Sequence, residues 1–353
     1  MTDLAGAAAA AARHRGRFSI WIERHPVRTS VFAILVLLFL FAVFAPWSPG
    51  LESVFGRKRI FVSAIMNGLT LGALYFVVAS GFTLIFGLMQ NVNLAHGSLY
   101  ALGGYIGYEV ATASGSWALS FIVSFLAIAF AGVLLQFLVF RRMEGEVLRQ
   151  TMVTIGISIV AGDAMLWIWG GGFYQIEAPR WLSGATQLPI VIAMKSDGSA
   201  VYLGYPLIRV AVLLASIVLG VAIWLVLNRS RIGMLVRAGV DDRQMLAATG
   251  VRVQLLFVSV FAFGAGLAGL AGVIGGTVQA LGPGEDIRFL LASLVVVIVG
   301  GMGSITGAAL GALIVGLAEQ LGSVYIPTYA AMITFLIMVV VLAIRPQGIM
   351  GRA

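Results

Sequence analysis

Cysteine is absent from this chain of 353 residues, which excludes disulfides and cysteine-ligated metals. Lysine is almost absent too: Lys58 and Lys195 do not follow a glycine, so there is no phosphate-binding G-x-x-x-x-G-K-[ST] loop. The three histidines, His14, His25 and His96, are too scattered for an H-E-x-x-H site, and no serine stands in G-x-S-x-G. We therefore expect a chain that is not an enzyme and that binds no cofactor of its own.

Charged residues are also scarce, at 10% of the chain, whereas 60% of residues are hydrophobic. With a mean hydropathy of +1.03, this composition is typical of an integral membrane protein. We expect an all-α, polytopic transmembrane helical bundle of about 9–10 spans, each of roughly 20 residues. The expected spans are residues 29–47, 60–86, 93–112, 117–140, 151–169, 206–227, 253–277, 289–302, 304–322 and 328–344.

The net charge of +8 would suggest nucleic acid in a soluble protein, but these arginines cluster in loops beside apolar runs. They therefore report orientation, and their distribution places both termini on the cytoplasmic side. Residues 57–59 conflict with this, because the cluster Arg57-Lys58-Arg59 would lie outside. If residues 60–112 cross only once, as a broken re-entrant unit, the N-terminus lies outside instead. A signal peptide is the rival interpretation of the first span, and the length of its apolar run disfavours it.

A polar segment, residues 229–252, contains five arginines and two aspartates between two apolar runs. Asp241 or Asp242 can cap a short helix, and Gly250 stands where that helix would stop. A loop that only connects two spans needs neither the caps nor the apolar residues between them, whereas a docking surface needs both. A positive loop that serves only topology is the alternative. The residues that we assign to docking are Arg237, Ala238, Asp241, Asp242, Met245, Leu246, Ala247, Ala248 and Gly250.

Residues 87–97, GLMQNVNLAHG, are polar but uncharged and interrupt two apolar runs. Broken helix inside a membrane is tolerated only in protein or beside a cavity, and transporters use such breaks to bind substrate. A carboxylate within an apolar span must likewise face protein or water. We therefore assign to a translocation path the residues Gln90, Asn91, Asn93, His96 and Asp163. The alternatives are a polar loop at the membrane surface and, for His96, a satisfied structural histidine.

The longest non-membrane segment, residues 170–205, combines aromatic residues, both signs of charge and an alternating stretch at 188–194. We expect it to be an extracytoplasmic loop that either receives a soluble partner or covers the bundle passively. Several spans carry small residues four apart, as at Gly68 and Gly72 or at Gly103 and Gly107. Such stripes indicate helices that pack closely against one another in a membrane.

Several motifs together resemble the branched-chain amino acid permease family of ABC importers, specifically its H-type subunit. They are Asn67-Gly-Leu-Thr-Leu-Gly-Ala-Leu-Tyr75, Gly81-Phe-Thr-Leu-Ile-Phe-Gly87, Asn93-Leu-Ala-His-Gly97, Gly300-Gly-Met-Gly-Ser-Ile-Thr-Gly307 and Arg345-Pro-Gln-Gly-Ile-Met-Gly351. The resemblance covers roughly residue 60 to the C-terminus and adds Asn67 to the translocation path. Residues 60–353 are then the permease domain, preceded at 1–59 by a basic cytoplasmic tail and an added N-terminal span.

The resemblance implies that residues 229–252 are a coupling loop that docks on a cytoplasmic ABC ATPase, which would bind ATP and magnesium. It also implies an M-type permease partner, an extracytoplasmic substrate-binding protein and a location in the bacterial inner membrane. Nucleic acid is not expected among the partners. Where such importers often carry Glu-Ala-Ala, this chain has Gln244-Met-Leu246. The pattern is shared by permeases for urea, short amides and aromatic or other carboxylates. A stand-alone channel or ion-coupled transporter is the alternative of another class, and the chain has few intramembrane carboxylates for it.

Overall fold

The computed structural model describes residues 57–89, 92–143, 145–194 and 199–351. The chain divides into two compact units, residues 1–62 with 188–203 and residues 63–187 with 204–353. The expected span at 29–47 lies outside the described residues, as do Gln90 and Asn91 and nearly all of the expected N-terminal region 1–59. The helices that follow belong almost wholly to the second unit.

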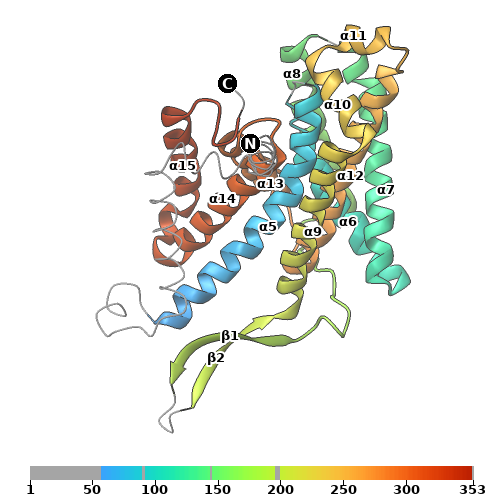
Figure 1. Ribbon diagram of the computed structural model, residues 1–353. Coiled ribbons are helices and arrows are strands. Elements are labelled where there is room, and N and C mark those ends of the chain that lie inside the picture. The colour runs from blue at the N-terminus through green and yellow to red at the C-terminus, as the bar shows by residue number, and fades with distance from the viewer. Residues whose placement is uncertain (1–56, 90–91, 144, 195–198, 352–353) are drawn as a thin grey trace, which may run out of the picture. The chain divides into compact units, whose positions relative to one another are not determined.

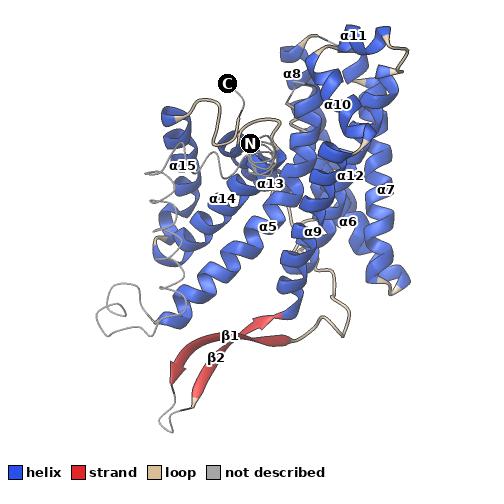
Figure 2. Ribbon diagram, viewed as in Figure 1, coloured by secondary structure: helices blue, strands red, loops and turns tan. Residues whose placement is uncertain are grey.

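Long helices make up most of the second unit (Figure 1, Figure 2). Their order is α5 (Lys58–Met89), α6 (His96–Ser114), α7 (Trp117–Leu138), η1 (Phe140–Met143), α8 (Val147–Trp169), α9 (Leu207–Arg229), α10 (Arg231–Asp241), α11 (Arg243–Ala248), α12 (Val253–Val278), α13 (Glu285–Gly300), α14 (Ile305–Tyr325), η2 (Pro327–Tyr329) and α15 (Ala330–Ile344).

Seven helical stretches of the described residues are long and apolar enough to cross a membrane. They contain α5, α7, α8, α9, α12, α14 and η2–α15. Two expected spans, α6 and α13, are not among them. The 16 residues of α13 extend only about 24 Å, which is less than the roughly 30 Å of a bilayer core. The polytopic helical fold is confirmed, and α13 is a shorter helix within it.

Local sequence explains where several helices begin and end. Ser116 precedes α7 and Ser304 precedes α14, and each hydroxyl accepts a hydrogen bond from a backbone N–H of the first turn, at 3.3 and 3.0 Å. Gly115 follows α6 with a φ of +65°, a left-handed conformation that favours glycine. These caps satisfy backbone groups that the helix itself leaves unpaired.

Close contacts between small residues hold the core of the second unit together. A Cβ atom added at Gly103 of α6 would lie 2.4 Å from the Cα atom of Gly269 in α12. Likewise, a Cβ atom at Gly72 of α5 would lie 2.8 Å from the carbonyl oxygen of Ala312 in α14. The packing expected of the small-residue stripes is confirmed, because no larger side chain fits at these crossings without moving the helices apart.

The C-terminal tail folds back on the end of α13. The backbone N–H of Ile349 donates to the carbonyl of Val299, and the N–H of Met350 donates to Gly300, both at 2.9 Å. Two of the sequence motifs, residues 300–307 and 345–351, therefore form one local structure. Gly301 and Gly348, both with positive φ, lie in contact there.

One part of the expected extracytoplasmic loop is not irregular. Strands β1 (Ala185–Met194) and β2 (Ala200–Pro206) pair as a two-stranded sheet, drawn red in Figure 2. The alternating stretch at 188–194 is therefore the periodicity of a strand, in which successive side chains face opposite sides. The expectation of an all-α chain is corrected in this one respect, because the described residues include a two-stranded sheet.

Candidate functional site

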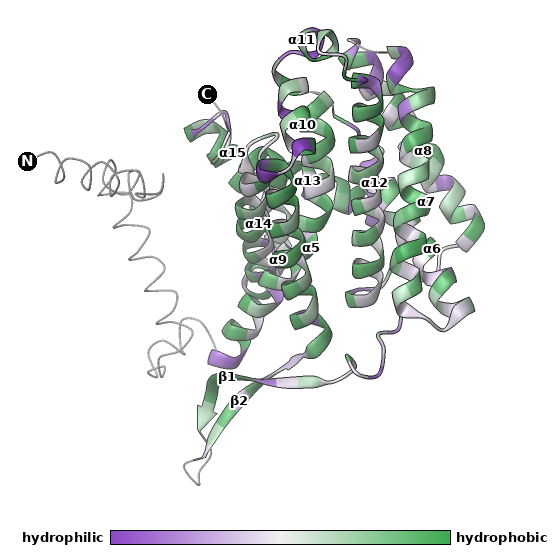
Figure 3. Cartoon of the chain, turned by 45° about the vertical axis from the view of Figure 1, so that its right-hand side comes forward, coloured by the Kyte–Doolittle hydropathy of each residue, from purple (hydrophilic) through white to green (hydrophobic). Residues whose placement is uncertain are grey.

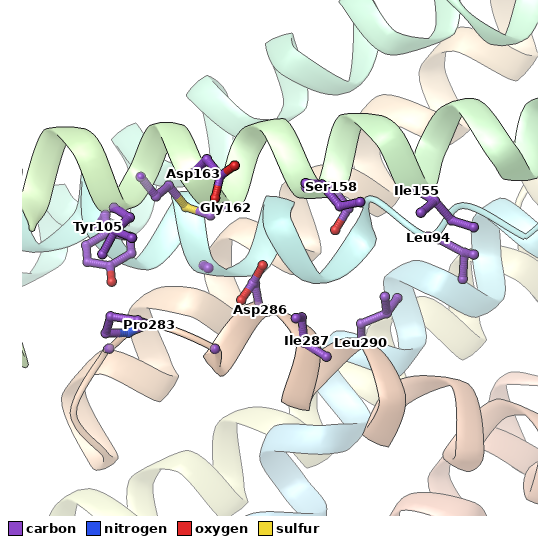
Figure 4. Close-up of a pocket in the computed structure, with 16 residues that line it drawn as sticks. Leu94, Tyr105, Ile155, Ser158, Gly162, Asp163, Pro283, Asp286, Ile287 and Leu290 are labelled. Atoms are coloured by element: carbon purple, nitrogen blue, oxygen red, sulfur yellow. The ribbon is translucent and has the colours of Figure 1, made fainter. Parts of the chain in front are cut away.

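A pocket of about 420 Å³ lies between α6, α8 and the beginning of α13 (Figure 4). Most of its lining is aliphatic and comes from α8 on one side and α13 on the other. Two carboxylates interrupt that lining: Asp163 on α8 and Asp286 in the first turn of α13. The apolar lining residues that Figure 4 labels are Leu94, Ile155, Pro283, Ile287 and Leu290.

The two carboxylates differ in exposure. The Asp286 side chain is buried, with 9% of its surface exposed, whereas Asp163 is exposed. A Cβ atom added at Gly162 would lie 3.3 Å from Oδ2 of Asp286, so this carboxylate lies against the backbone of α8 beside Asp163. Within the described part of the chain, neither carboxylate has a hydrogen bond or an ion pair. The pocket therefore contains negative charge that the described residues do not balance.

A second site lies in the polar segment, where two short helices form. Ser230 begins α10 by accepting a hydrogen bond from the N–H of Gly233 at 3.1 Å. Asp242 begins α11 by accepting from the N–H groups of Gln244 and Met245, both at 2.9 Å. Gly250 has a φ of +82° and ends the turn that follows α11. The cap and the stop are confirmed, with Asp242 as the capping residue, whereas the sequence did not predict α10.

The two faces of α11 have different surroundings. Leu246 is 6% exposed and lies against Gly239 of α10, and the guanidinium of Arg243 lies 4.3 Å from the ring centroid of Phe257 in α12. These contacts fix the helix on the bundle. By contrast, Met245 is 66% exposed, and Ala247 and Ala248 are exposed as well. The apolar residues expected between the caps therefore have two roles. Leu246 anchors the helix, whereas Met245, Ala247 and Ala248 form an exposed surface.

Comparison with known proteins identifies the kind of molecule that carries these two sites. The model of a family described as "Branched-chain amino acid transport system / permease component" matches residues 64–342. The chain belongs to this permease family. It is 28% identical over 304 residues to the high-affinity branched-chain amino acid transport system permease protein BraD of Pseudomonas aeruginosa, covering 83% of this chain and 96% of that protein.

Two further relatives carry the name LivH. The high-affinity branched-chain amino acid permease protein of Salmonella typhimurium is 27% identical, again over 83% of this chain and 96% of the relative. A probable branched-chain amino acid permease of Methanocaldococcus jannaschii is 26% identical over 84% and 93% of the two chains. No solved structure was found to match this permease. The family match begins at residue 64, after the N-terminal segment.

In this permease, the polar residues of segment 87–97 that the structure describes face their own chain. Nε2 of His96 lies 3.1 Å from the carbonyl oxygen of Val78, and the ring packs edge-on against Phe82. The side-chain oxygen of Asn93 accepts from the N–H of Ala95 at 3.1 Å. His96 is 0% and Asn93 1% exposed. The intervening Leu94 lines the pocket of Asp163, so this turn closes one side of it.

Asn67 lies in a different place. It accepts a hydrogen bond from the guanidinium of Arg209 at the beginning of α9. Together they line a polar cavity of about 100 Å³, to which Thr70, Gln279 and Gln320 also contribute. The structure thus places Asp163 at one pocket and Asn67 at another, whereas Asn93 and His96 are buried and line neither. Their part in translocation stays a prediction.

The sequence did not predict a further charged network of the permease. Arg288 of α13 pairs with Glu285 and with Glu319 of α14, both at 3.3 Å, and the Tyr75 hydroxyl of α5 donates to Glu319 at 2.7 Å. The first turn of α13 therefore carries the ion pair of Glu285 with Arg288 on this side and Asp286 on the side of the pocket. Acidic residues directly after Gly-Pro-Gly at 282–284 were the signal that could have identified this turn.

The remaining docking residues lie on or next to α10. Arg237 is exposed, and its guanidinium donates to the carbonyl of Leu227 at the end of α9. Ala238 is half-buried, and Asp241 is the last residue of α10. Figure 3 shows hydrophilic segments near α10 and α11, whereas most of α5, α9 and α12 is hydrophobic. A cleft of about 550 Å³ containing Arg141 and Arg243 lies at the same end of the helices.

Proposed function

We propose that this permease is the H-type membrane subunit of an ATP-driven importer of branched-chain amino acids. It works without catalytic residues of its own, and a partner ATPase supplies the energy. With an M-type permease it forms the path through a bacterial inner membrane, and an extracytoplasmic binding protein delivers the substrate. Both termini and most of the arginine-rich helix ends lie on the cytoplasmic side, in accordance with the positive-inside rule, and the cluster Arg57-Lys58-Arg59 is the exception.

The observation that carries this proposal is the construction of α11. A helix of six residues has little stability by itself, yet here it has a side-chain cap at Asp242 and two contacts that fix it on the bundle. Its free surface presents Met245 and two alanines, small enough for another protein to approach closely. Helices anchored on one face and apolar on the other suit a groove in a partner.

Among substrates of the wider family pattern, the pocket favours amino acids. Its aliphatic lining suits a branched side chain, and its two aspartates suit a cationic group. An aromatic or other carboxylate without an ammonium group brings no cation for the aspartates, and urea or a short amide has no charge for them to bind. This chemistry supports branched-chain amino acids as the transported class.

The test is reconstitution of the purified proteins in liposomes. Leucine uptake is expected only when this permease, its M-type partner, the ATPase and the binding protein are all present. ATP must be supplied on the side of the membrane on which the ATPase binds. The permease alone, energised by a proton or sodium gradient, should accumulate nothing. Accumulation by the permease alone would establish a secondary transporter and reject the proposal.

A further inference from the structure

The pocket between α8 and α13 holds two carboxylates in surroundings that disfavour two like charges. Asp286 is nine-tenths buried, and the side chains around it are mainly aliphatic. A buried carboxylate without a hydrogen bond or an ion pair is unfavourable, and a cation beside it offsets that cost. No basic residue lines this pocket in the described ranges. A cation from outside the chain would therefore bind favourably.

The same pocket also exposes the beginning of α13. Gly282, Pro283 and Gly284 line it, and Gly284 precedes the helix without a side-chain cap. In the described part of the chain, the backbone N–H groups of Asp286 and Ile287 have no acceptor. Free N–H groups at a helix N-terminus attract anionic groups, and discontinuous helices in transporters bind carboxylates in this way. The pocket thus offers acceptors for a cation and donors for an anion in one turn.

We propose that this pocket binds the zwitterionic head of the transported amino acid. The substrate ammonium lies with Asp163 and Asp286, the substrate carboxylate takes the free N–H groups of α13, and the side chain lies on the aliphatic lining. This inference rests on the proposed function and identifies the substrate-recognition residues within it. The volume of about 420 Å³ is within the range of roughly 300–1,000 Å³ typical of small-molecule sites.

Two other cations fit the pocket less well. A metal ion requires several ligands, and the described residues contain no group of three or more His, Cys, Asp or Glu side chains that could hold one. A proton would neutralise one carboxylate without needing either the aliphatic lining or the free helix N-terminus. An ammonium that is covalently joined to a carboxylate and an aliphatic group uses all three features.

The absence of cysteine makes a direct test simple, because Ile159→Cys places one thiol in this chain at the pocket wall. In the purified complete transporter, its rate of modification is measured with a cationic and with an anionic methanethiosulfonate. Relative to the same ratio at an exposed control position, the cationic reagent is expected to react about tenfold faster, because a cleft lined by charge of one sign raises the local concentration of the opposite ion by about 10-fold or more. Asp163→Asn with Asp286→Asn should remove the preference, and leucine should slow the labelling.

Trp181→Cys is the control position, because Trp181 is exposed in the loop after α8 and does not line the pocket. Its labelling should respond neither to leucine nor to the aspartate substitutions. The same ratio of cationic to anionic labelling rates at residues 159 and 181 would overturn the proposal. So would a charge preference without protection by leucine, because the pocket would then attract cations without binding substrate.

Uptake separates failure of this inference from failure of the proposed function. The double variant Asp163→Asn/Asp286→Asn is expected to lose at least about tenfold in leucine uptake by the reconstituted transporter. Glu109→Gln is the matched control, because Glu109 lies outside the pocket and accepts a hydrogen bond from Trp169 that glutamine can also accept. If the unmodified transporter does not import leucine, the proposed function falls. If it imports leucine and the double variant transports equally well, only the zwitterion site falls.

Discussion

The hydroxyl of Tyr75 donates a 2.7 Å hydrogen bond to Oε2 of Glu319 and so joins α5 to α14. Glu319 also pairs with Arg288 at 3.3 Å, which adds α13 to the same network. The Tyr75 ring is 1% exposed and packs edge-on against Phe289. One buried tyrosine therefore belongs to a polar network that joins the three helices α5, α13 and α14.

Replacement of Tyr75 by Phe should destabilise the permease. A hydrogen bond to a charged group contributes about 1.5–3 kcal/mol, and the substitution removes it while keeping the ring. A lower Tm of the purified complex is the expected result. Tyr108→Phe is the control, because the Tyr108 hydroxyl has no hydrogen bond within the described residues. An equal Tm for both variants would show that the hydroxyl of Tyr75 contributes nothing to stability.

Replacement of Ala247 by Trp should weaken binding of the ATPase. Ala247 is exposed on α11 beside the anchoring Leu246, so added bulk acts on the partner rather than on the bundle. Overpacking typically costs about 1–3 kcal/mol, which corresponds to association weaker by about 5- to 150-fold. The measurement is co-purification with the ATPase together with substrate-stimulated ATP hydrolysis. Met332→Trp, an exposed change on α15, should alter neither. Unchanged association of Ala247→Trp would place the docking surface elsewhere.

Replacement of Gly162 by Ala should reduce leucine uptake, whereas the same change at Gly156 should not. Both glycines lie in α8, where alanine is favoured by about 1 kcal/mol in helix propensity. The added Cβ atom at 162 would lie 3.3 Å from Oδ2 of Asp286, whereas nothing lies within 4 Å at 156. The stability of both variants should match or exceed that of the parent. Equal uptake by the two variants would mean that Asp286 moves aside without consequence.

Replacement of Gly348 by Ala should detach the C-terminal tail from α13. Gly348 has a φ of +79°, and an added Cβ atom would lie 2.5 Å from backbone atoms of Gly301. Both the backbone conformation and the contact disfavour a side chain, at a cost of at least about 1–3 kcal/mol. Faster hydrogen exchange at Ile349 and Met350 is the expected signal, because their N–H groups bond to α13. Gly184→Ala, with nothing within 4 Å, provides the comparison.

Features that depend on residues close together in the sequence could be predicted from the sequence. The composition alone indicated a polytopic helical membrane protein, because only helices or closed barrels satisfy their backbone inside lipid. The helix of 243–248 followed from Asp242 and Gly250, since caps act on N–H and C=O groups within one turn. Asp163 was predicted to line the translocation path because a carboxylate in an apolar span must face protein or water. None of these inferences required knowledge of which helices are neighbours.

The relations between distant segments were decided only by the tertiary structure. Asp286 faces the backbone beside Asp163 because α8 and α13 lie on opposite sides of one pocket, and nothing local in either sequence encodes that approach. The burial of His96 depends in the same way on Val78 and Phe82 of another helix. Periodicity states which residues share a face of a helix. The rotation of that face is set by contacts such as Gly103 against Gly269, where two backbones approach more closely than any side chain allows.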